Sequence, residues 1–154
     1  FEVYRKILDS FEIKWVARTD NDVSKVPRKE EWQYAGLNRA LALCKYEPLK
    51  NELAEITQKQ KLEKHAIYKD ILKQNNIYVS INDLEGDISN ELSEQLKEYV
   101  GTDDAEKAAD YLRGKKATRM QDFLKEYSSS LSSIYFGELI LPLLTSVSLA
   151  KEGK

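Results

Sequence analysis

The sequence predicts an α/β fold in which a parallel sheet is flanked by helices. Two apolar, β-prone runs, residues 13–17 and 77–81, indicate buried strands, and segments with helical periodicity lie between and after them. Each run passes directly into a group of acidic residues. Because parallel neighbours require a crossover that is usually helical, this order of strands and helices favours a parallel sheet. Only two strands are clear, so we expect the sheet's first, N-terminal strand to lie upstream of residue 1.

Helices are expected on both sides of the first strand. Residues 2–10 are typical of a helix, and a second helix should follow the loop that Pro27 closes. Apolar residues of the first segment lie on one side of a helix, and those of the second recur every three or four positions, as one helix face requires. These positions are Val3, Ile7 and Leu8 in the first helix, and Tyr34, Leu37, Leu41 and Cys44 in the second.

The segment before the second strand, residues 49–74, is rich in Lys, Glu and Gln, with few apolar residues. This composition predicts a helical insertion: a hairpin that projects from the body and turns near residues 57–61, with Asn75 and Asn76 ending the helical stretch. Charge-rich helices of this kind usually face water. A contact with DNA or with a partner protein is the alternative.

The chain beyond the second strand is expected to be helical. Amphipathic segments cover residues 88–99, 105–112 and 117–127, and glycines at 101 and 114 end the first two. A serine cluster then precedes an apolar C-terminal helix over residues 131–149, which Pro142 should kink.

Length and composition are those of a globular domain. The chain has 154 residues, of which 42% are hydrophobic and 32% charged. We assign residues 1–127 to one domain, with its insertion at about 49–74, and residues 128–154 to a C-terminal helical segment. The longest apolar run, residues 139–144, is too short to cross a membrane, so no membrane partner is expected. Since the chain starts with Phe1 inside an apparent helix, we expect it to be part of a longer protein.

Few residues are available for thiol or imidazole chemistry. The single cysteine, Cys44, excludes an internal disulfide and fits a reducing, cytoplasmic compartment. With a single histidine, His65, a zinc site of His and Cys ligands or a catalytic triad is not expected; a core thiol and a surface imidazole are. The formal net charge of −2, from 24 basic and 26 acidic residues, neither favours nor excludes nucleic acid as a partner.

Both predicted strands deliver carboxylates to the same edge of the sheet. Asp20 and Asp22 follow the first strand, and Asp83 and Glu85 follow the second. In an extended chain, residues i and i+2 point the same way, so each pair can converge. Two carboxylates about 4 Å apart repel by roughly 4 kcal/mol at an effective dielectric constant near 20. Divalent cations would relieve this repulsion, and Mg²⁺ or Mn²⁺ is the natural choice for oxygen ligands.

Each acidic group also has a purely structural interpretation. The Asp-Asn-Asp run at residues 20–22 could form an Asx turn after a strand. Asp87 could cap the N-terminus of a helix that begins at Ile88. Both interpretations stay open from these patterns alone.

Three motifs in this order and spacing resemble a known family. They run from Trp15 to Asp22 (WVARTDND), from Ile77 to Asp87 (IYVSINDLEGD) and from Lys115 to Leu124 (KKATRMQDFL). Together they resemble the Rossmann-like Toprim domain of the overcoming-lysogenization-defect (OLD) family of ATP-dependent endonucleases, and most of all the nuclease subunit of the Gabija anti-phage defence system. The resemblance covers nearly the whole chain.

The resemblance implies a DNA endonuclease with a two-metal Toprim centre that holds Mg²⁺ or Mn²⁺. By its motifs, Asp20, Asp22, Asp83 and Glu85 would bind metal, with Asp87 as a possible further ligand; Asp83 would also be catalytic. A catalytic lysine matches Lys116, because the helix motif follows it directly, and Lys115 is the adjacent alternative. A lysine there would offset the charge that develops on the phosphate.

The family also implies partners outside this chain. These are double-stranded DNA, ATP bound by an upstream domain, a homo-oligomer formed through the full-length chain, and a helicase-like subunit, all in a prokaryotic cytoplasm. The Toprim pattern opens with a glutamate on its first strand, and neither Glu2 nor Glu12 stands in that context. We therefore expect residues 1–154 alone to be an incomplete nuclease. A non-catalytic assembly module and Toprim primase or ribonuclease chemistry are the alternatives.

Overall fold

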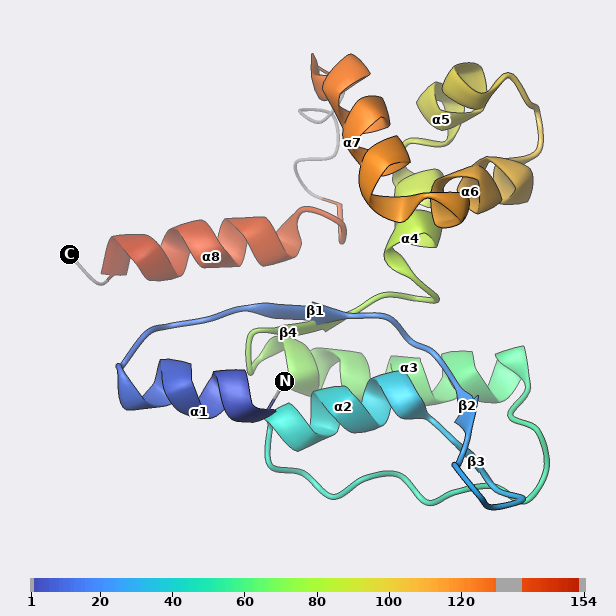
Figure 1. Ribbon diagram of the computed structural model, residues 1–154. Coiled ribbons are helices and arrows are strands. Elements are labelled where there is room, and N and C mark those ends of the chain that lie inside the picture. The colour runs from blue at the N-terminus through green and yellow to red at the C-terminus, as the bar shows by residue number, and fades with distance from the viewer. Residues whose placement is uncertain (1, 130–136, 153–154) are drawn as a thin grey trace. The chain divides into compact units, whose positions relative to one another are not determined.

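A computed structural model describes residues 2–129 and 137–152, without the side chains of Glu2 and Lys116 (Figure 1). The described chain is a mixed α/β structure with more helix than strand. Its helices are α1 (Glu2–Ser10), α2 (Ala35–Leu43), α3 (Gln58–Lys73), α4 (Leu84–Glu91), α5 (Ser93–Val100), α6 (Ala105–Gly114), α7 (Lys116–Glu126) and α8 (Leu141–Glu152). Its strands are β1 (Ala17–Thr19), β2 (Ser24–Lys25), β3 (Trp32–Gln33) and β4 (Ile77–Val79).

The chain divides into two compact units. Unit 1 comprises residues 1–83 and 142–154, and unit 2 comprises residues 84–141. Each has its own cluster of buried apolar side chains. The expected boundary at residues 127 and 128 does not coincide with this division.

The two predicted strands are adjacent and parallel, as expected. β1 pairs with β4 in a register that places Ala17 opposite Ile77 and Thr19 opposite Val79. The first strand is displaced from its predicted position, residues 13–17, because the chain there is not packed on both faces: Ile13 is 51% exposed. Apolar β-prone residues identified a strand, but burial and pairing fix its ends.

The core of unit 1 lies between this sheet and helices α2 and α3. Leu37 and Leu41 of α2, Leu72 of α3 and Ile77 of β4 are almost completely buried together, as the predicted spacing of α2 requires. The opposite side of the strand pair faces α8, where the Tyr78 hydroxyl group hydrogen-bonds the Thr145 hydroxyl group at 2.5 Å. Figure 1 shows α2 and α3 on one side of the two strands and α8 on the other.

The predicted helical hairpin at residues 49–74 was wrong. Residues 49–57 are not helical, and α3 is one continuous helix that packs on the sheet. The expected turn is the helix N-terminus: Thr57 accepts a hydrogen bond from the Gln60 backbone, and the Gln60 side chain accepts one from the Thr57 backbone. This capping box starts a helix where composition alone indicated a turn. As predicted, α3 ends just before Asn75 and Asn76, and Asn76 adopts φ 59°.

Two further features of unit 1 differ from expectation. A short antiparallel pair, β2 with β3, occupies part of the predicted loop after the first strand. Helix α1 forms as predicted, but two apolar residues of its predicted face are largely open to solvent: Val3 is 68% and Ile7 48% exposed. The apolar residues predicted the helix correctly, but their spacing does not show which of them are buried.

Unit 2 is built from α4 to α7. The predicted helix over residues 88–99 is two helices, because α4 ends at Glu91 and α5 begins at Ser93. Gly101 ends α5 with φ 74°, as expected of a left-handed C-cap. Around the buried Phe123, the rings of Tyr99 and Tyr127 pack with centroids 5.5 and 5.3 Å away.

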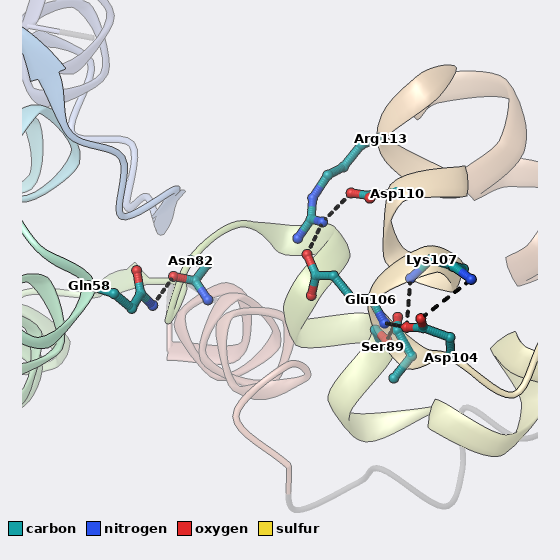
Figure 2. Close-up of polar contacts among 9 residues, drawn as sticks. Gln58, Asn82, Ser89, Asp104, Glu106, Lys107, Asp110 and Arg113 are labelled. Carbon is teal, nitrogen blue, oxygen red and sulfur yellow. Dashed lines mark hydrogen bonds and ion pairs between the residues drawn. The ribbon is translucent and has the colours of Figure 1, made fainter.

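Polar contacts fix the start and the exposed face of α6 (Figure 2). The Asp104 carboxylate accepts hydrogen bonds from the backbone of Glu106 and Lys107, which caps the helix. Arg113 donates to Glu106 and to Asp110, each at 2.7 Å.

The C-terminal helix begins later than predicted. α8 starts at Leu141, so Pro142 occupies its first turn, where the missing N–H costs nothing, rather than the helix interior, where a kink was expected. The part of the expected helix at residues 131–136 lies outside the described residues. Within the described ranges, no helix has the length and apolar character needed to cross a bilayer.

Candidate functional site: an acidic edge

The carboxyl ends of β1 and β4 continue into two loops that stay paired. The Ser80 backbone N–H donates to the Thr19 carbonyl at 3.0 Å, and the Asn21 N–H donates to the Asn82 carbonyl at 2.8 Å. The parallel hydrogen-bond pattern therefore extends beyond the strands into residues 20–22 and 80–83. We call these two loops, with Asp20, Asp22 and Asp83, the acidic edge.

Asn21 ties the two loops together with its side chain as well. It is completely buried, and its amide nitrogen donates to the Ile81 carbonyl at 3.0 Å. Asp20 is half-buried and Asp22 exposed, so the buried position alternates with the acidic ones, as the predicted i, i+2 relation requires. Among the described residues, the buried amide oxygen of Asn21 has no hydrogen-bond partner.

Helix α2 approaches the first loop more closely than a side chain would allow. The Gly36 N–H donates to the Asp22 carbonyl at 2.9 Å. A Cβ atom on Gly36 would lie 2.0 Å from the Asp20 carbonyl oxygen, so a larger residue would displace the loop. One turn later, Arg39 forms an ion pair with the Asp22 carboxylate at 2.5 Å.

Helix α3 contributes a second cation to the acidic edge. The Gln58 amide donates to the Asn82 side chain at 2.8 Å, which holds the start of the helix against the second loop (Figure 2). Burial lowers the pKa of the Lys61 ammonium group, while the negative charges of Asp83 and Asp22 act to raise it. Carboxylates from both loops thus act on one ammonium group.

Two of the predicted ligands, Glu85 and Asp87, belong to α4 in unit 2. Both are buried, with 3% and 9% of their surface exposed, and both lie in the first turn of the helix. The expectation that Asp83 and Glu85 alternate along an extended chain was wrong, because Glu85 is helical. Asp87 does not cap a helix at Ile88, because α4 already begins at Leu84. Carboxylates in a first turn are stabilised by the positive end of the helix.

The predicted catalytic lysines lie where α6 meets α7. Lys115 separates the two helices and is exposed, and Lys116 is the first residue of α7, as the motif predicted. The Lys116 side chain lies outside the described part of the chain. Its assignment therefore stays a prediction from the motif.

The acidic edge offers the oxygen donors that a hard divalent cation prefers. Its carboxylates and the unpartnered amide oxygen of Asn21 are all suitable ligands for Mg²⁺. Within residues 2–129 and 137–152, no three His, Cys, Asp or Glu side chains are placed to hold a metal ion together. Mg²⁺ commonly binds through one or two carboxylates and keeps several waters, so the donor set fits a partly hydrated ion.

Sequence analysis missed the roles of four residues: Asn21 within the acidic edge, and Gly36, Arg39 and Lys61 on the helices beside it. Gly36 could have been noticed in the sequence, because glycine is common where another part of the molecule comes close to the backbone. The other three gave no such signal. Asn21 stood between two acids and was taken as part of a turn, while Arg39 and Lys61 are ordinary cations on charge-rich helices.

Comparison of the sequence with protein-family models and with curated proteins finds no match.

Proposed function

We propose that the acidic edge binds Mg²⁺ or Mn²⁺ and that the protein uses it to hydrolyse phosphodiester bonds in double-stranded DNA. The observation that carries this proposal is the backbone pairing of two acid-bearing loops beyond two parallel strands. In open α/β sheets, ligands bind outside the carboxyl ends of the strands. The resemblance of these loops to the OLD-family Toprim motifs supplies the class of reaction.

The chain's own residues would hold and position the reactants. Asp20, Asp22 and Asp83 would provide carboxylate ligands, and the Asn21 amide oxygen a neutral one. The paired loops keep these groups at fixed separations, which lowers the entropic cost of aligning a phosphate with its attacking water. When bound, divalent cations activate water and stabilise the leaving oxygen.

The resemblance extends the proposal beyond the acidic edge. By the same motifs, Glu85, with Asp87 as a further candidate, would be a metal ligand of the two-metal Toprim pattern, and Lys116, or Lys115, would stabilise charge on the phosphate. An upstream domain would bind ATP, and the full-length protein would form a homo-oligomer that works with a helicase-like subunit in anti-phage defence. The prokaryotic cytoplasm is the proposed compartment.

The test is cleavage of plasmid DNA by the full-length protein across a titration of Mg²⁺ and Mn²⁺. We expect cleavage in the wild type that EDTA abolishes, and loss of cleavage in Asp83→Ala. Because this change relieves repulsion among the carboxylates but also removes the attraction between Asp83 and Lys61, the free energy of unfolding should stay close to that of the wild type. Urea denaturation of the same preparations measures it.

Asp70→Ala is the matched control, because Asp70 is an exposed carboxylate on α3 of the same unit. Its cleavage should equal that of the wild type. Wild-type cleavage by Asp83→Ala, with a normal unfolding transition, would rule out the acidic edge as the catalytic site.

An assembly module is the second candidate function, and α1 with the segment after it favours it. Tyr4 and Phe11 are 72% and 73% exposed, and Ile13 is 51% exposed. Apolar side chains gathered on a surface often mark a protein interface. A wild-type protein that neither binds Mn²⁺ nor cleaves DNA, but associates through this surface, would favour assembly over hydrolysis.

A further inference from the structure

The N-terminus of α3 is fixed beside the second loop of the acidic edge. The capping box between Thr57 and Gln60 defines where the helix begins. Gln58, in the first turn, donates to Asn82 at 2.8 Å (Figure 2). Residues three apart share one helix face, so Lys61 lies on the face that this hydrogen bond turns toward the loop.

The surroundings of Lys61 are acidic and partly dehydrated. Its side chain is half-buried, and Asp83 and Asp22 are the carboxylates that act on it. Burial disfavours the charged ammonium group and the carboxylates favour it, with burial the larger effect. A further anion that approaches the acidic edge would stabilise the charged form of such an ammonium group.

Arg39 and Lys61 supply positive charge to the edge from two different helices. Arg39 contacts the Asp22 carboxylate directly, so its charge is matched by one carboxylate. Lys61 is instead influenced by carboxylates of both loops. When divalent cations offset these carboxylates, the anion best placed to satisfy the Lys61 ammonium group would be a phosphate of a bound strand.

We propose that Lys61 is a phosphate-binding residue of the acidic edge, held by the anchored start of α3 so that it draws the DNA backbone toward Asp22 and Asp83. This inference rests on the proposed nuclease function and adds to it a residue of α3 that contacts the substrate. It is separate from the transition-state role expected of Lys116.

The experiment compares Lys61→Ala and Lys61→Arg with the wild type in the full-length protein. For Lys61→Ala we expect binding of a short DNA duplex to weaken about tenfold, because one charge-assisted phosphate contact is lost. Binding of Mn²⁺ alone, followed by its paramagnetic signal, should tighten about threefold, because a competing positive charge has left the carboxylates. Lys61→Arg keeps the charge, so its Mn²⁺ affinity should equal that of the wild type and its DNA affinity should fall far less than that of Lys61→Ala.

Lys69→Ala is the control, because Lys69 is an exposed lysine further along the same helix. It should change neither affinity. Opposite shifts in DNA and Mn²⁺ affinity for Lys61→Ala would support the inference, since a residue that only stabilises the fold would weaken both together. Unchanged DNA affinity, or parallel losses of both affinities, would overturn it.

The outcomes separate this inference from the proposed function. A wild-type protein that cleaves DNA with metal, together with an unchanged Lys61→Ala variant, rejects the role of Lys61 alone. A wild-type protein that shows no metal-dependent cleavage rejects the nuclease function and, with it, this role.

Discussion

Asn21 shows how a single buried side chain organises the acidic edge. Its amide nitrogen and its backbone N–H both donate to carbonyls of the second loop. An unpaired amide oxygen in the interior costs about 1–3 kcal/mol, so the position carries a penalty unless a further donor or cation completes it. Asn21 therefore joins the two loops through its donor groups, at the cost of a buried amide oxygen without a partner among the described residues.

The positions of the acidic residues could be predicted from the sequence where these residues directly follow a strand. Asp20, Asp22 and Asp83 follow the paired strands at one edge as predicted, because strand direction determines which ends meet, whereas Glu85, predicted with them, lies in α4. Lys61 could not be found in this way, since its position depends on how α3 docks. Helix packing brings together residues that are distant in sequence, and no local pattern records such contacts.

Lys116→Ala should lower the turnover number of DNA cleavage about a hundredfold or more while leaving DNA affinity within about threefold. The reason is that a cation acting on charge developed in the transition state contributes little to ground-state binding. Single-turnover kinetics and a DNA-binding titration measure the two quantities. Equal losses of turnover and DNA affinity would make Lys116 an ordinary phosphate contact. Lys125→Ala, in the same helix, is the control.

At the scale of elements, α3 is the clearest correction. Its composition is rich in charge, and its apolar positions are few, so a solvated hairpin was expected. The structure gives a helix that packs on β4 and buries Leu72. His65 of α3 also contacts the backbone of β4: its imidazole Nε2 atom lies 2.9 Å from the Val79 carbonyl oxygen. A helix can dock through a few contacts that are too sparse to register as a periodic pattern.

Thr57→Ala should lower the free energy of unfolding by about 1 kcal/mol, because it removes the side chain that caps α3. Urea denaturation measures this loss, and amide exchange should show faster opening in the first turn of the helix. Thr118→Ala, at an exposed position inside α7, is the control and should be neutral or slightly stabilising, because alanine favours helix. An equal loss for both variants would mean that the capping box contributes nothing.

At the scale of the whole molecule, two apolar clusters share one chain. One is centred on Leu37, Leu41 and Ile77, and the other on Leu96, Leu112 and Phe123. The sequence predicted most of these residues as buried helix or strand positions. It did not predict the division into two units. Periodicity shows which face of a helix or strand is buried, but it does not show which other element packs against that face.

Phe123→Ala should lower the stability of unit 2 by about 3–5 kcal/mol, the usual cost of removing a buried aromatic ring. Hydrogen exchange read by mass spectrometry should show faster exchange in α4 to α7, while amides around Ile77 keep their protection. A uniform loss of protection across both units would show instead that they unfold as one. Phe11→Ala, at an exposed position, is the control.

The continued pairing of the two loops has a consequence for how the protein could be studied. Backbone N–H and carbonyl groups make this pairing, and every residue except proline carries both. Acids can therefore be exchanged for their amides while the shape of the edge survives. An Asp→Asn variant would therefore change the charge of the acidic edge while its backbone pairing stays in place, so the two properties can be tested separately.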